Sequence, residues 1–526
     1  MQNSKVSNNW EKIHTQVTLY LKEFLLKLQN PVETQAAKLK AILAENSDTV
    51  FGEKYQFSTI NSYAEYAARV PIHEYADLAP HIQEMAEGKT QVLCHEPIVA
   101  FEMTGGSTQG GKLIPYTAAG LVAFQQAILP WIADLLQHKP EIKLGRSYWA
   151  ISPVSRTSEV TSGGTPIGMV SDADYFGQEL AAWMIDLLAV PPEIAMINDI
   201  SEWQYLTALY LLAAEDLSFI SVWSPTFLLQ IIQEIQLNYD ALIADISTGK
   251  SISSICLPQR GSVLKAAVVN GIIDLQKVWK NLSLISCWTD AAAKAFISQL
   301  QDLFPDVLIQ GKGLLATEGV VSIPLLGCDT PVLAVDSGFY EFVDDNGKIR
   351  LCDELVTGEI YGVIMTTNSG LYRYNLGDKV LVKGWKEATP LLEFMGRGGI
   401  VSDLCGEKLT EEFVLACLGE RRGFAMVVPQ IEPHPHYILF LDEDEYDDNT
   451  AINQGLKLDL AFNANPQYEY ARKLGQLAEL QVVRVKNPMT SYVNYALSRG
   501  QRLGDIKPPV LMLNPDGKLI FSRRVT

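Results

Sequence analysis

Short apolar runs alternate with longer helical patterns along the chain. A run at 97–103 precedes a glycine-rich stretch. Further runs of strand length lie at 147–151, 219–223, 282–288, 332–334 and 358–366. Apolar runs separated by amphipathic segments are typical of strands that helices cover on both faces. The pattern therefore predicts an α/β fold of layered sheets and helices.

Two local signals place element boundaries. Residues 118–137 form a long apolar stretch with helical spacing, and Thr117 stands before it as a candidate N-cap. Three of the four residues at 396–399 are glycine, which gives the backbone the freedom that a hinge needs. We therefore expect a large N-terminal domain at 1–396 and a smaller, mobile C-terminal domain at 397–526.

Length and charge narrow the class of protein. A chain of 526 residues with 48% hydrophobic residues exceeds what one core usually holds. Its 42 Lys and Arg against 61 Asp and Glu give a net charge of -19, which repels phosphate backbones and anionic lipid surfaces. We expect no nucleic acid and no membrane as partner.

The cysteines and the chain start indicate the compartment. Seven cysteines are scattered without a C-x-x-C pair, which favours a reducing environment. Residues 1–10 are polar, and no stretch approaches the ~20 apolar residues that cross a bilayer. We expect a cytoplasmic protein.

The stretch 104–112 (TGGSTQGGK) has the composition of a polyphosphate-binding loop. Glycines let backbone N–H groups turn toward an anion, and the Lys112 ammonium adds a point charge. Hydroxyls add further donors. The candidate donors are Thr104, Ser107 and Thr108. An ordinary glycine-rich turn has the same composition, so this stretch alone does not distinguish a phosphate-binding loop from a structural turn.

Residues 106–112 also fit the G-x-x-x-x-G-K pattern of P-loop kinases and ATPases. In that class the lysine is followed by a Ser or Thr that holds Mg²⁺ and by a helix. Here Leu113 follows the lysine, and Pro115 stands where the helix should already run. The P-loop interpretation is therefore disfavoured.

Two later motifs combine with the loop. In 313–319 (GLLATEG), the Thr317 hydroxyl is suited to a phosphate oxygen and the Glu318 carboxylate to Mg²⁺. In 370–378 (GLYRYNLGD), a turn presents Asp378 as an acceptor for two ribose hydroxyls. Taken alone, each motif could equally be an ordinary structural segment with no part in a functional site.

In this order, the three motifs and the glycine hinge resemble the adenylate-forming superfamily of acyl-CoA ligases, luciferase and peptide-synthetase adenylation domains. Within it the chain looks most like the GH3 family of acyl-acid amido synthetases, over nearly its whole length. The segments that carry this closer resemblance are 70–80 (VPIHEYADLAP), 112–115 (KLIP), 372–378 (YRYNLGD), 401–411 (VSDLCGEKLTE) and 504–509 (GDIKPP).

The resemblance implies an adenylate-forming fold with a small α+β C-terminal domain on a hinge, and ATP and Mg²⁺ as cofactors. A carboxylic acid would become an acyl-adenylate, and the acyl group would pass to an amine, such as an amino acid. The implied catalytic residues are Lys112, Glu318, Lys408 and Lys507, with Glu318 also the metal ligand. Arg397 joins the phosphate-loop hydroxyls, Thr317 and Asp378 as a nucleotide-binding residue.

Three other functions stay open at this point. An acyl-CoA ligase shares the first half-reaction and uses a thiol acceptor. A catalytically silent nucleotide-binding or ligand-binding protein would keep the scaffold, although retention of Lys112, Glu318 and Asp378 together disfavours it. The P-loop phosphotransferase is the third. The sequence names neither the acid nor the oligomeric state.

Overall fold

The computed structural model describes residues 2–103, 112–149, 160–168, 175–197, 199–249, 255–399, 401–404, 407–473, 476–501, 503–514 and 517–522. The chain divides into two compact units. The first comprises Met1–Val222, Ile231–Cys287 and Val307–Phe394, and the second comprises Trp223–Gln230, Trp288–Asp306 and Met395–Thr526. Sheets and helices alternate through both, which confirms the expected α/β class.

A four-stranded parallel sheet lies in the first unit. Its strands, in spatial order, are β3 (Arg146–Trp149), β4 (Leu217–Ser221), β7 (Leu284–Cys287) and β8 (Leu308–Gly311). Every residue of β4 and β7 is buried, as expected for a parallel sheet covered on both faces. The apolar runs at 147–151, 219–223 and 282–288 each overlap one of these strands, so a strand in each region is confirmed.

Helices connect these strands along the chain. Between β3 and β4 run α7 (Gln178–Ile185) and α8 (Ile200–Ala213). Between β4 and β7 run α9 (Pro225–Thr248), α10 (Pro258–Ala266), the short hairpin of β5 (Val268–Val269) and β6 (Ile272–Ile273), and α11 (Leu275–Val278). Helix α12 (Ile297–Leu303) precedes β8.

A seven-stranded sheet forms the other layer of the first unit. Its spatial order is β11 (Ser322–Ile323), β12 (Val332–Leu333), β17 (Thr389–Arg397), β16 (Tyr374–Lys386), β15 (Ile360–Thr366), β13 (Phe339–Val343) and β14 (Ile349–Arg350). Burial alternates along the first nine residues of β16, so one face of that strand packs on the core. The runs at 332–334 and 358–366 are confirmed as β12 and β15.

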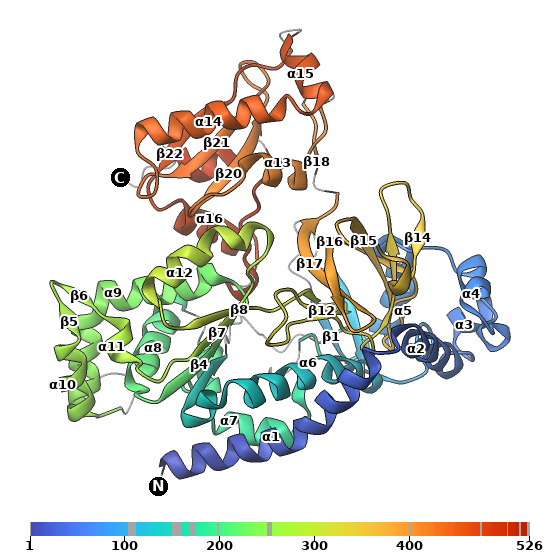
Figure 1. Ribbon diagram of the computed structural model, residues 1–526, viewed down its shortest axis with the longest axis horizontal. Coiled ribbons are helices and arrows are strands. Elements are labelled where there is room, and N and C mark those ends of the chain that lie inside the picture. The colour runs from blue at the N-terminus through green and yellow to red at the C-terminus, as the bar shows by residue number, and fades with distance from the viewer. Residues whose placement is uncertain are drawn as a thin grey trace. The chain divides into compact units, whose positions relative to one another are not determined.

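The N-terminal part of the first unit is helical. Helix α1 (Gln2–Lys27) lies alongside α6 (Ala118–His138) (Figure 1). The intervening helices are α2 (Pro31–Glu45), α3 (Val50–Lys54), α4 (Tyr63–Arg69) and α5 (Tyr75–Ala86).

The segment around Lys112 forms a hairpin and then a helix. Strand β1 (Ile98–Met103) pairs antiparallel with β2 (Leu113–Thr117). Thr117 caps α6, because its hydroxyl accepts from the backbone N–H of Gly120 at 3.0 Å. The predicted strand and the predicted cap are both confirmed. Since a strand and not a helix follows Lys112, the geometry of a P-loop is absent from this described segment.

Helix α6 corrects one expectation. By length and composition it is apolar enough to cross a membrane, whereas the sequence alone suggested no such stretch. Most of it is buried inside the first unit. Its carboxylate Asp134 is 4% exposed and accepts from the Leu326 N–H at 2.6 Å. A buried, hydrogen-bonded carboxylate of this kind is typical of a core helix in a folded domain.

The second unit contains a three-stranded sheet. Strand β21 (His436–Asp442) lies between β20 (Ala425–Gln430), to which it is antiparallel, and β22 (Gln481–Val485), to which it is parallel. A hairpin of β18 (Val401–Ser402) and β19 (Leu409–Thr410) precedes it. This unit also includes α12 and the start of α9, and its later helices are α13 (Glu411–Leu418), α14 (Asp448–Phe462), α15 (Pro466–Lys473), α16 (Pro488–Ser498) and α17 (Gly517–Ser522).

The glycine-rich junction has the backbone that the sequence suggests. Gly396 and Gly399 have φ of 121° and 101°, values that side-chain-bearing residues rarely adopt. A Cβ atom at either position would meet nothing within 4 Å, so the requirement for glycine is conformational rather than steric. Rotation about this junction, and the domain boundary at 396, remain predictions.

Candidate active site

Two of the family-like segments form one assembly in the first unit. The segment 70–80 runs beside the motif 370–378 and pairs with it through a parallel bridge at His73 and Tyr374. The His73 N–H donates to the Arg373 carbonyl at 2.9 Å, and the Asn375 N–H donates to the His73 carbonyl at 2.9 Å. Backbone hydrogen bonds from the segment 70–80, which lies outside the sheet, therefore hold the motif 370–378 in place.

Arg373 fixes this assembly from within. It is 5% exposed and forms a paired contact with Glu341, from Nη2 to Oε1 at 2.7 Å and from Nε to Oε2 at 2.9 Å. Its Nη1 donates to the Val70 carbonyl at 2.8 Å. A guanidinium with its donors satisfied by carboxylate and carbonyl oxygens acts here as a structural anchor. The arginine of this motif thus positions its neighbours and faces away from solvent.

Lys112 extends from the start of β2 onto this assembly. Its Nζ lies 5.2 Å from the ring centre of Tyr75 and donates to the Tyr374 hydroxyl at 3.3 Å. The Tyr75 hydroxyl accepts from the Leu113 N–H at 2.9 Å, which fixes the strand directly after the lysine. The ammonium is therefore held between two aromatic rings and remains half-buried.

Glu318 completes a chain of polar contacts. It lies in the tight hairpin of β9 (Leu315–Ala316) and β10 (Gly319–Val320) and is 8% exposed. The Tyr374 hydroxyl donates to Glu318 Oε1 at 3.3 Å. Lys112, Tyr374 and Glu318 are thus linked in a row, although they come from three distant parts of the sequence.

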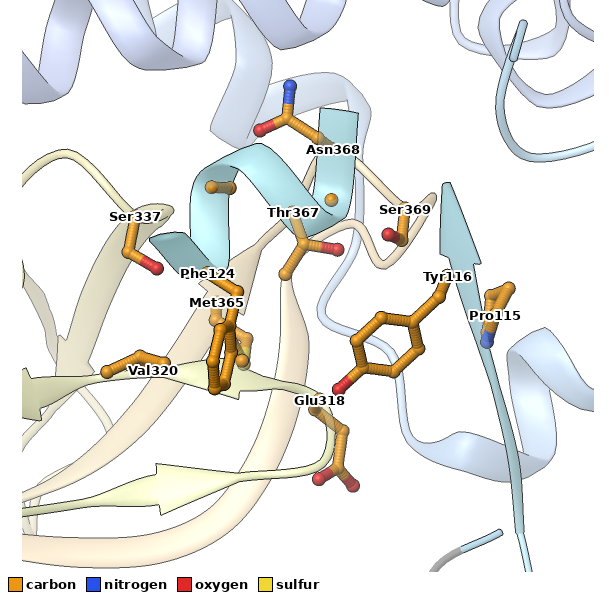
Figure 2. Close-up of a pocket in the computed structure, with 13 residues that line it drawn as sticks. Pro115, Tyr116, Phe124, Glu318, Val320, Ser337, Met365, Thr367, Asn368 and Ser369 are labelled. Atoms are coloured by element: carbon orange, nitrogen blue, oxygen red, sulfur yellow. The ribbon is translucent and has the colours of Figure 1, made fainter. Parts of the chain in front are cut away.

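A pocket opens beside Glu318 (Figure 2). It holds about 380 Å³ of empty space, open solvent included. Its lining comes from β2, α6, the β9–β10 hairpin, the segment before β13, the end of β15 and the turn after it: Pro115, Tyr116, Gly120, Ala123, Phe124, Glu318, Gly319, Val320, Ser337, Met365, Thr367, Asn368 and Ser369.

Two contacts shape the pocket wall. The Tyr116 hydroxyl donates to the Thr317 carbonyl at 2.6 Å, and burial raises the pKa of Tyr116, so its hydroxyl stays a donor. A Cβ atom on Gly120 would lie 2.0 Å from Ser369 Oγ, so the start of α6 approaches the opposite wall as closely as it does only because residue 120 is glycine. Thr317 is itself half-buried beside Glu318.

Asp378 lies further along β16 and is 8% exposed. The pairing of β15 with β16 shifts register between Asn375 and Lys379, so Asp378 sits in an irregular part of the strand. Bulges of this kind redirect side chains and are common next to active sites. The structure therefore brings Lys112, Thr317 and Glu318 together and carries Asp378 on the same strand as Tyr374.

The other predicted site residues lie elsewhere. Thr104, Ser107 and Thr108 fall outside the described residues. Arg397 is the last residue of β17. Lys408 and Lys507 belong to the second unit, so their part in the site remains a prediction.

The two lysines of the second unit differ in their surroundings. Lys408 is exposed and has a φ of 47°, a conformation uncommon for lysine. Its neighbour Glu407 is fully buried, accepts from the Tyr437 hydroxyl and bonds the Leu404 N–H at 2.8 Å. Lys507 has its Nζ 3.3 Å from the ring centre of Trp288 in the same unit. Lys408 thus follows a buried, hydrogen-bonded glutamate, whereas Lys507 rests on an indole.

The predicted magnesium site fits the residues present. The described residues contain no group of three or more His, Cys, Asp or Glu side chains arranged for a metal. Mg²⁺ in nucleotide enzymes typically needs only one or two carboxylates, with phosphate oxygens and waters as the other ligands. Glu318, a nearly buried carboxylate at the pocket wall, meets that requirement.

Sequence reasoning missed the tyrosines of this site. Tyr75, Tyr116 and Tyr374 all lie in or directly beside the segments that carry the family resemblance, yet none was assigned a role. The available signal was that a tyrosine lies within 70–80 and within 372–378 and directly after 112–115. Buried tyrosines usually find a hydrogen-bond partner, and here the partners are site residues.

Comparison with family models covers most of the chain. The GH3 family N-terminal domain matches residues 20–309, the GH3 family central domain matches 331–397, and the GH3 family C-terminal domain matches 419–516.

Curated relatives match over nearly their whole length. Indole-3-acetic acid-amido synthetase GH3.4 of Arabidopsis thaliana is 22% identical, over 95% of this chain and 92% of that protein. Jasmonoyl--L-amino acid synthetase GH3.5 of Oryza sativa subsp. japonica is 22% identical, over 96% of this chain and 97% of that protein.

Solved structures show the same fold. The acyl acid amido synthetase AtGH3.15 in complex with 2,4-DB has a TM-score of 0.85 at 18% identity, covering 95% of each chain. A 2-hydroxyisobutyryl-CoA ligase in the postadenylation state has a TM-score of 0.52 at 10% identity, covering 86% of this chain and 85% of that one. The adenylate-forming fold expected from the sequence is confirmed. With a family model matching more than half of its length, this chain belongs to the GH3 family.

Proposed function

We propose that this chain is an ATP-dependent ligase that activates a carboxylic acid as its acyl-adenylate and transfers the acyl group to the amine of an amino acid. Membership of the GH3 family supports the proposal, and so do relatives named as amido synthetases. The observation that carries it is the row of Lys112, Tyr374 and Glu318 beside the pocket. A cation, a hydroxyl and a carboxylate in contact are the groups that a nucleotide and its metal require.

In the first half-reaction a carboxylate oxygen of the acid attacks the α-phosphorus of ATP, and the bond to pyrophosphate breaks. The Lys112 ammonium neutralises charge on the phosphates. Glu318 would hold Mg²⁺, which would supply positive charge against the phosphates. Thr317 lies beside Glu318 for the α-phosphate, and Asp378 would accept from the ribose hydroxyls. The protein's main task in this step is to position two anions against each other.

In the second half-reaction an amine nitrogen attacks the acyl carbonyl carbon, and AMP leaves with the electrons of the broken anhydride bond. The amine, if bound as an ammonium, must release one proton before it attacks and a second after the C–N bond forms, and the mixed anhydride must meanwhile be protected from water. We assign this closure to rotation at 396–399, which would bring Lys408 or Lys507 to the site. The cytoplasmic location and the lack of nucleic-acid and membrane partners also remain predictions.

Product analysis tests the proposal. Purified protein, ATP, Mg²⁺ and a panel of carboxylic acids would be offered either amino acids or coenzyme A, and the products identified by mass spectrometry. We expect AMP and an N-acyl amino acid. A thioester as the only product would support the acyl-CoA ligase instead, and ATP binding without turnover would support a silent binding protein. Glu318→Ala is tested in the same assay. Its control is Glu354→Ala, at an acidic residue of the short helix η6 (Cys352–Glu354).

A further inference from the structure

Lys408 of the second unit is an exposed lysine between two buried residues. Glu407 before it and Leu409 after it are both 0% exposed, whereas Lys408 is exposed and has a φ of 47°. A side chain at positive φ costs free energy that glycine would not, and such strain persists only where the surroundings impose it. Seven other described non-glycine residues also have a positive φ, so the angle alone does not mark a function. The contacts on either side of Lys408 supply the second observation.

The Glu407 carboxylate is fixed inside the second unit. Its Oε1 accepts from the Leu404 N–H at 2.8 Å and from the Tyr437 hydroxyl. Burial, and after it the hydrogen bond to Glu407, raises the pKa of Tyr437, so the phenol keeps its proton and stays a donor. Ser402 Oγ lies 3.0 Å from the same hydroxyl. These contacts tie the residue before Lys408 to β21, which carries Tyr437, and to β18, which carries Ser402.

The peptide bond that joins Glu407 to Lys408 is fixed as well. Asn465 Nδ2 donates to the Glu407 carbonyl, which is the oxygen of that peptide, at 2.6 Å. On the other side of the lysine, Leu409 pairs with Ser402 in the β18–β19 hairpin. Both neighbours of Lys408 are thus held in place, and the left-handed backbone at residue 408 is the conformation that joins them.

We propose that Glu407, Tyr437 and Asn465 are positioning residues for Lys408. They hold its backbone in the left-handed region and thereby fix the direction in which the side chain leaves the hairpin, so that the ammonium reaches the reacting groups in one orientation. A misplacement of about 1 Å can cost a hundredfold in rate, which is a reason to fix a long, flexible side chain at its base. The assignment rests on the proposed function for the reaction that Lys408 serves.

A matched pair of variants separates positioning from stability. Tyr437→Phe removes the donor to Glu407, whereas Tyr468→Phe removes another buried hydroxyl of the same unit that donates to a carboxylate, that of Asp459. Both variants should lose stability. Only Tyr437→Phe should lower kcat for amide formation, by about tenfold to hundredfold. KM for ATP should stay unchanged, because the residues proposed to bind ATP belong to the first unit.

Double variants test whether Tyr437 acts through the lysine. Residues that act as one unit are not additive, so Tyr437→Phe should change kcat no further once Lys408→Ala has removed the ammonium. The stability loss from Tyr437→Phe should persist in that background. Equal kcat values for wild type and Tyr437→Phe, or the same fold-loss with and without the lysine, would overturn the assignment.

Urea denaturation tests the strained backbone without any reaction. Lys408→Gly and Lys408→Ala both remove the long side chain, but only glycine adopts a φ of 47° without strain. The equilibrium constant for unfolding should therefore be severalfold smaller for Lys408→Gly than for Lys408→Ala, the reverse of the order at ordinary backbone angles. This advantage of glycine should shrink in Tyr437→Phe, where the hairpin relaxes. A Lys408→Ala variant more stable than Lys408→Gly would count decisively against the assignment.

If Tyr437→Phe does not fold, Asn465→Asp decides. Aspartate keeps an oxygen for the Gln467 N–H, which Asn465 accepts at 2.9 Å, and replaces the donor to the Glu407 carbonyl with a second oxygen. The expected result is the same loss of kcat and the same reduced advantage of glycine at 408, and wild-type behaviour in both would refute the assignment. Failure of the proposed function is separate, because wild type would then form no amide while the advantage of Lys408→Gly remained.

Discussion

The Tyr374 hydroxyl donates to the Glu318 carboxylate at 3.3 Å, and Lys112 donates to the same hydroxyl at the same distance. One phenol thus joins the cation proposed for the phosphates to the carboxylate proposed for Mg²⁺. This link holds the ammonium and the carboxylate on either side of one hydroxyl. Preorganisation of this kind lowers the reorganisation needed when ATP and metal bind.

Tyr374→Phe should therefore impair adenylation without unfolding the protein. Hydrogen bonds to charged groups contribute about 1.5–3 kcal/mol, so we expect kcat/KM for ATP to fall by about tenfold to hundredfold. Acid-dependent pyrophosphate exchange measures the effect. Tyr361→Phe, which also removes a buried hydroxyl bonded to a carboxylate, is the matched control and should keep the wild-type rate. Equal rates for Tyr374→Phe and wild type would remove Tyr374 from the site.

The Arg373–Glu341 pair should prove essential to stability. Arg373→Met leaves the Glu341 carboxylate, 1% exposed, without its counter-ion, and breaking such a pair typically costs about 3–5 kcal/mol. Urea denaturation measures the loss. The double variant Arg373→Met with Glu341→Gln should recover part of the stability, because it removes the unpaired charge and keeps a partner for the Tyr63 hydroxyl. A single variant as stable as wild type would contradict the structural role of Arg373.

Local sequence signals predicted the elements well. The apolar runs became β3, β4, β7, β12 and β15, and the Thr117 cap and the start of α6 were placed correctly. These features depend on short-range rules of periodicity and capping, which sequence carries directly. The expectation that no stretch is long and apolar enough to cross a bilayer was wrong for α6, although most of that helix is buried inside the first unit.

Long-range relationships could not be predicted in the same way. Tyr374 acts through residues that only folding brings beside it, and no local pattern marks a hydroxyl that bridges two motifs. Arg373 stands in a motif that suggests chemistry, yet its buried pairing with Glu341 is structural. Lys312, which directly follows β8 and is 6% exposed, was not foreseen, because a lysine is expected at the surface by default. The positions of charged side chains depend on tertiary contacts more than on neighbours in sequence.

Lys312 should leave a signature in the pH dependence of stability. Its folded-state pKa is lowered to about 7, so between about pH 7 and pH 10 the unfolded chain holds a proton that the folded chain has released. The free energy of unfolding therefore rises with pH across this window, by up to ~1.4 kcal/mol per pH unit from this group. Below pH 7 both states are protonated, and the contribution no longer changes.

Urea denaturation at several pH values measures this increment as a difference between variants. Lys312→Met should lack the rise, whereas Lys40→Met, at an exposed lysine of α2, should retain it. Parallel curves for wild type and Lys312→Met would show that the lysine is not desolvated in solution.

The glycine junction should affect the second half-reaction selectively. Gly396→Ala and Gly347→Ala both place a side chain at positive φ, where neither would clash. Both should lose roughly 1 kcal/mol of stability from backbone strain. Only Gly396→Ala should slow amide formation relative to adenylation, as judged by stopped-flow and quench measurements of AMP release. Equal ratios of the two rates in both variants would argue against a hinge at this position.

Adenylation of a carboxylic acid is the central step of the proposed function. Purified protein is incubated with ATP, Mg²⁺, radiolabelled pyrophosphate and a panel of carboxylic acids, alongside Glu318→Ala. We predict exchange of label into ATP that requires an acid, requires Mg²⁺ and is lost in Glu318→Ala. Acid-dependent cleavage of ATP to ADP, with no exchange, would contradict the central claim.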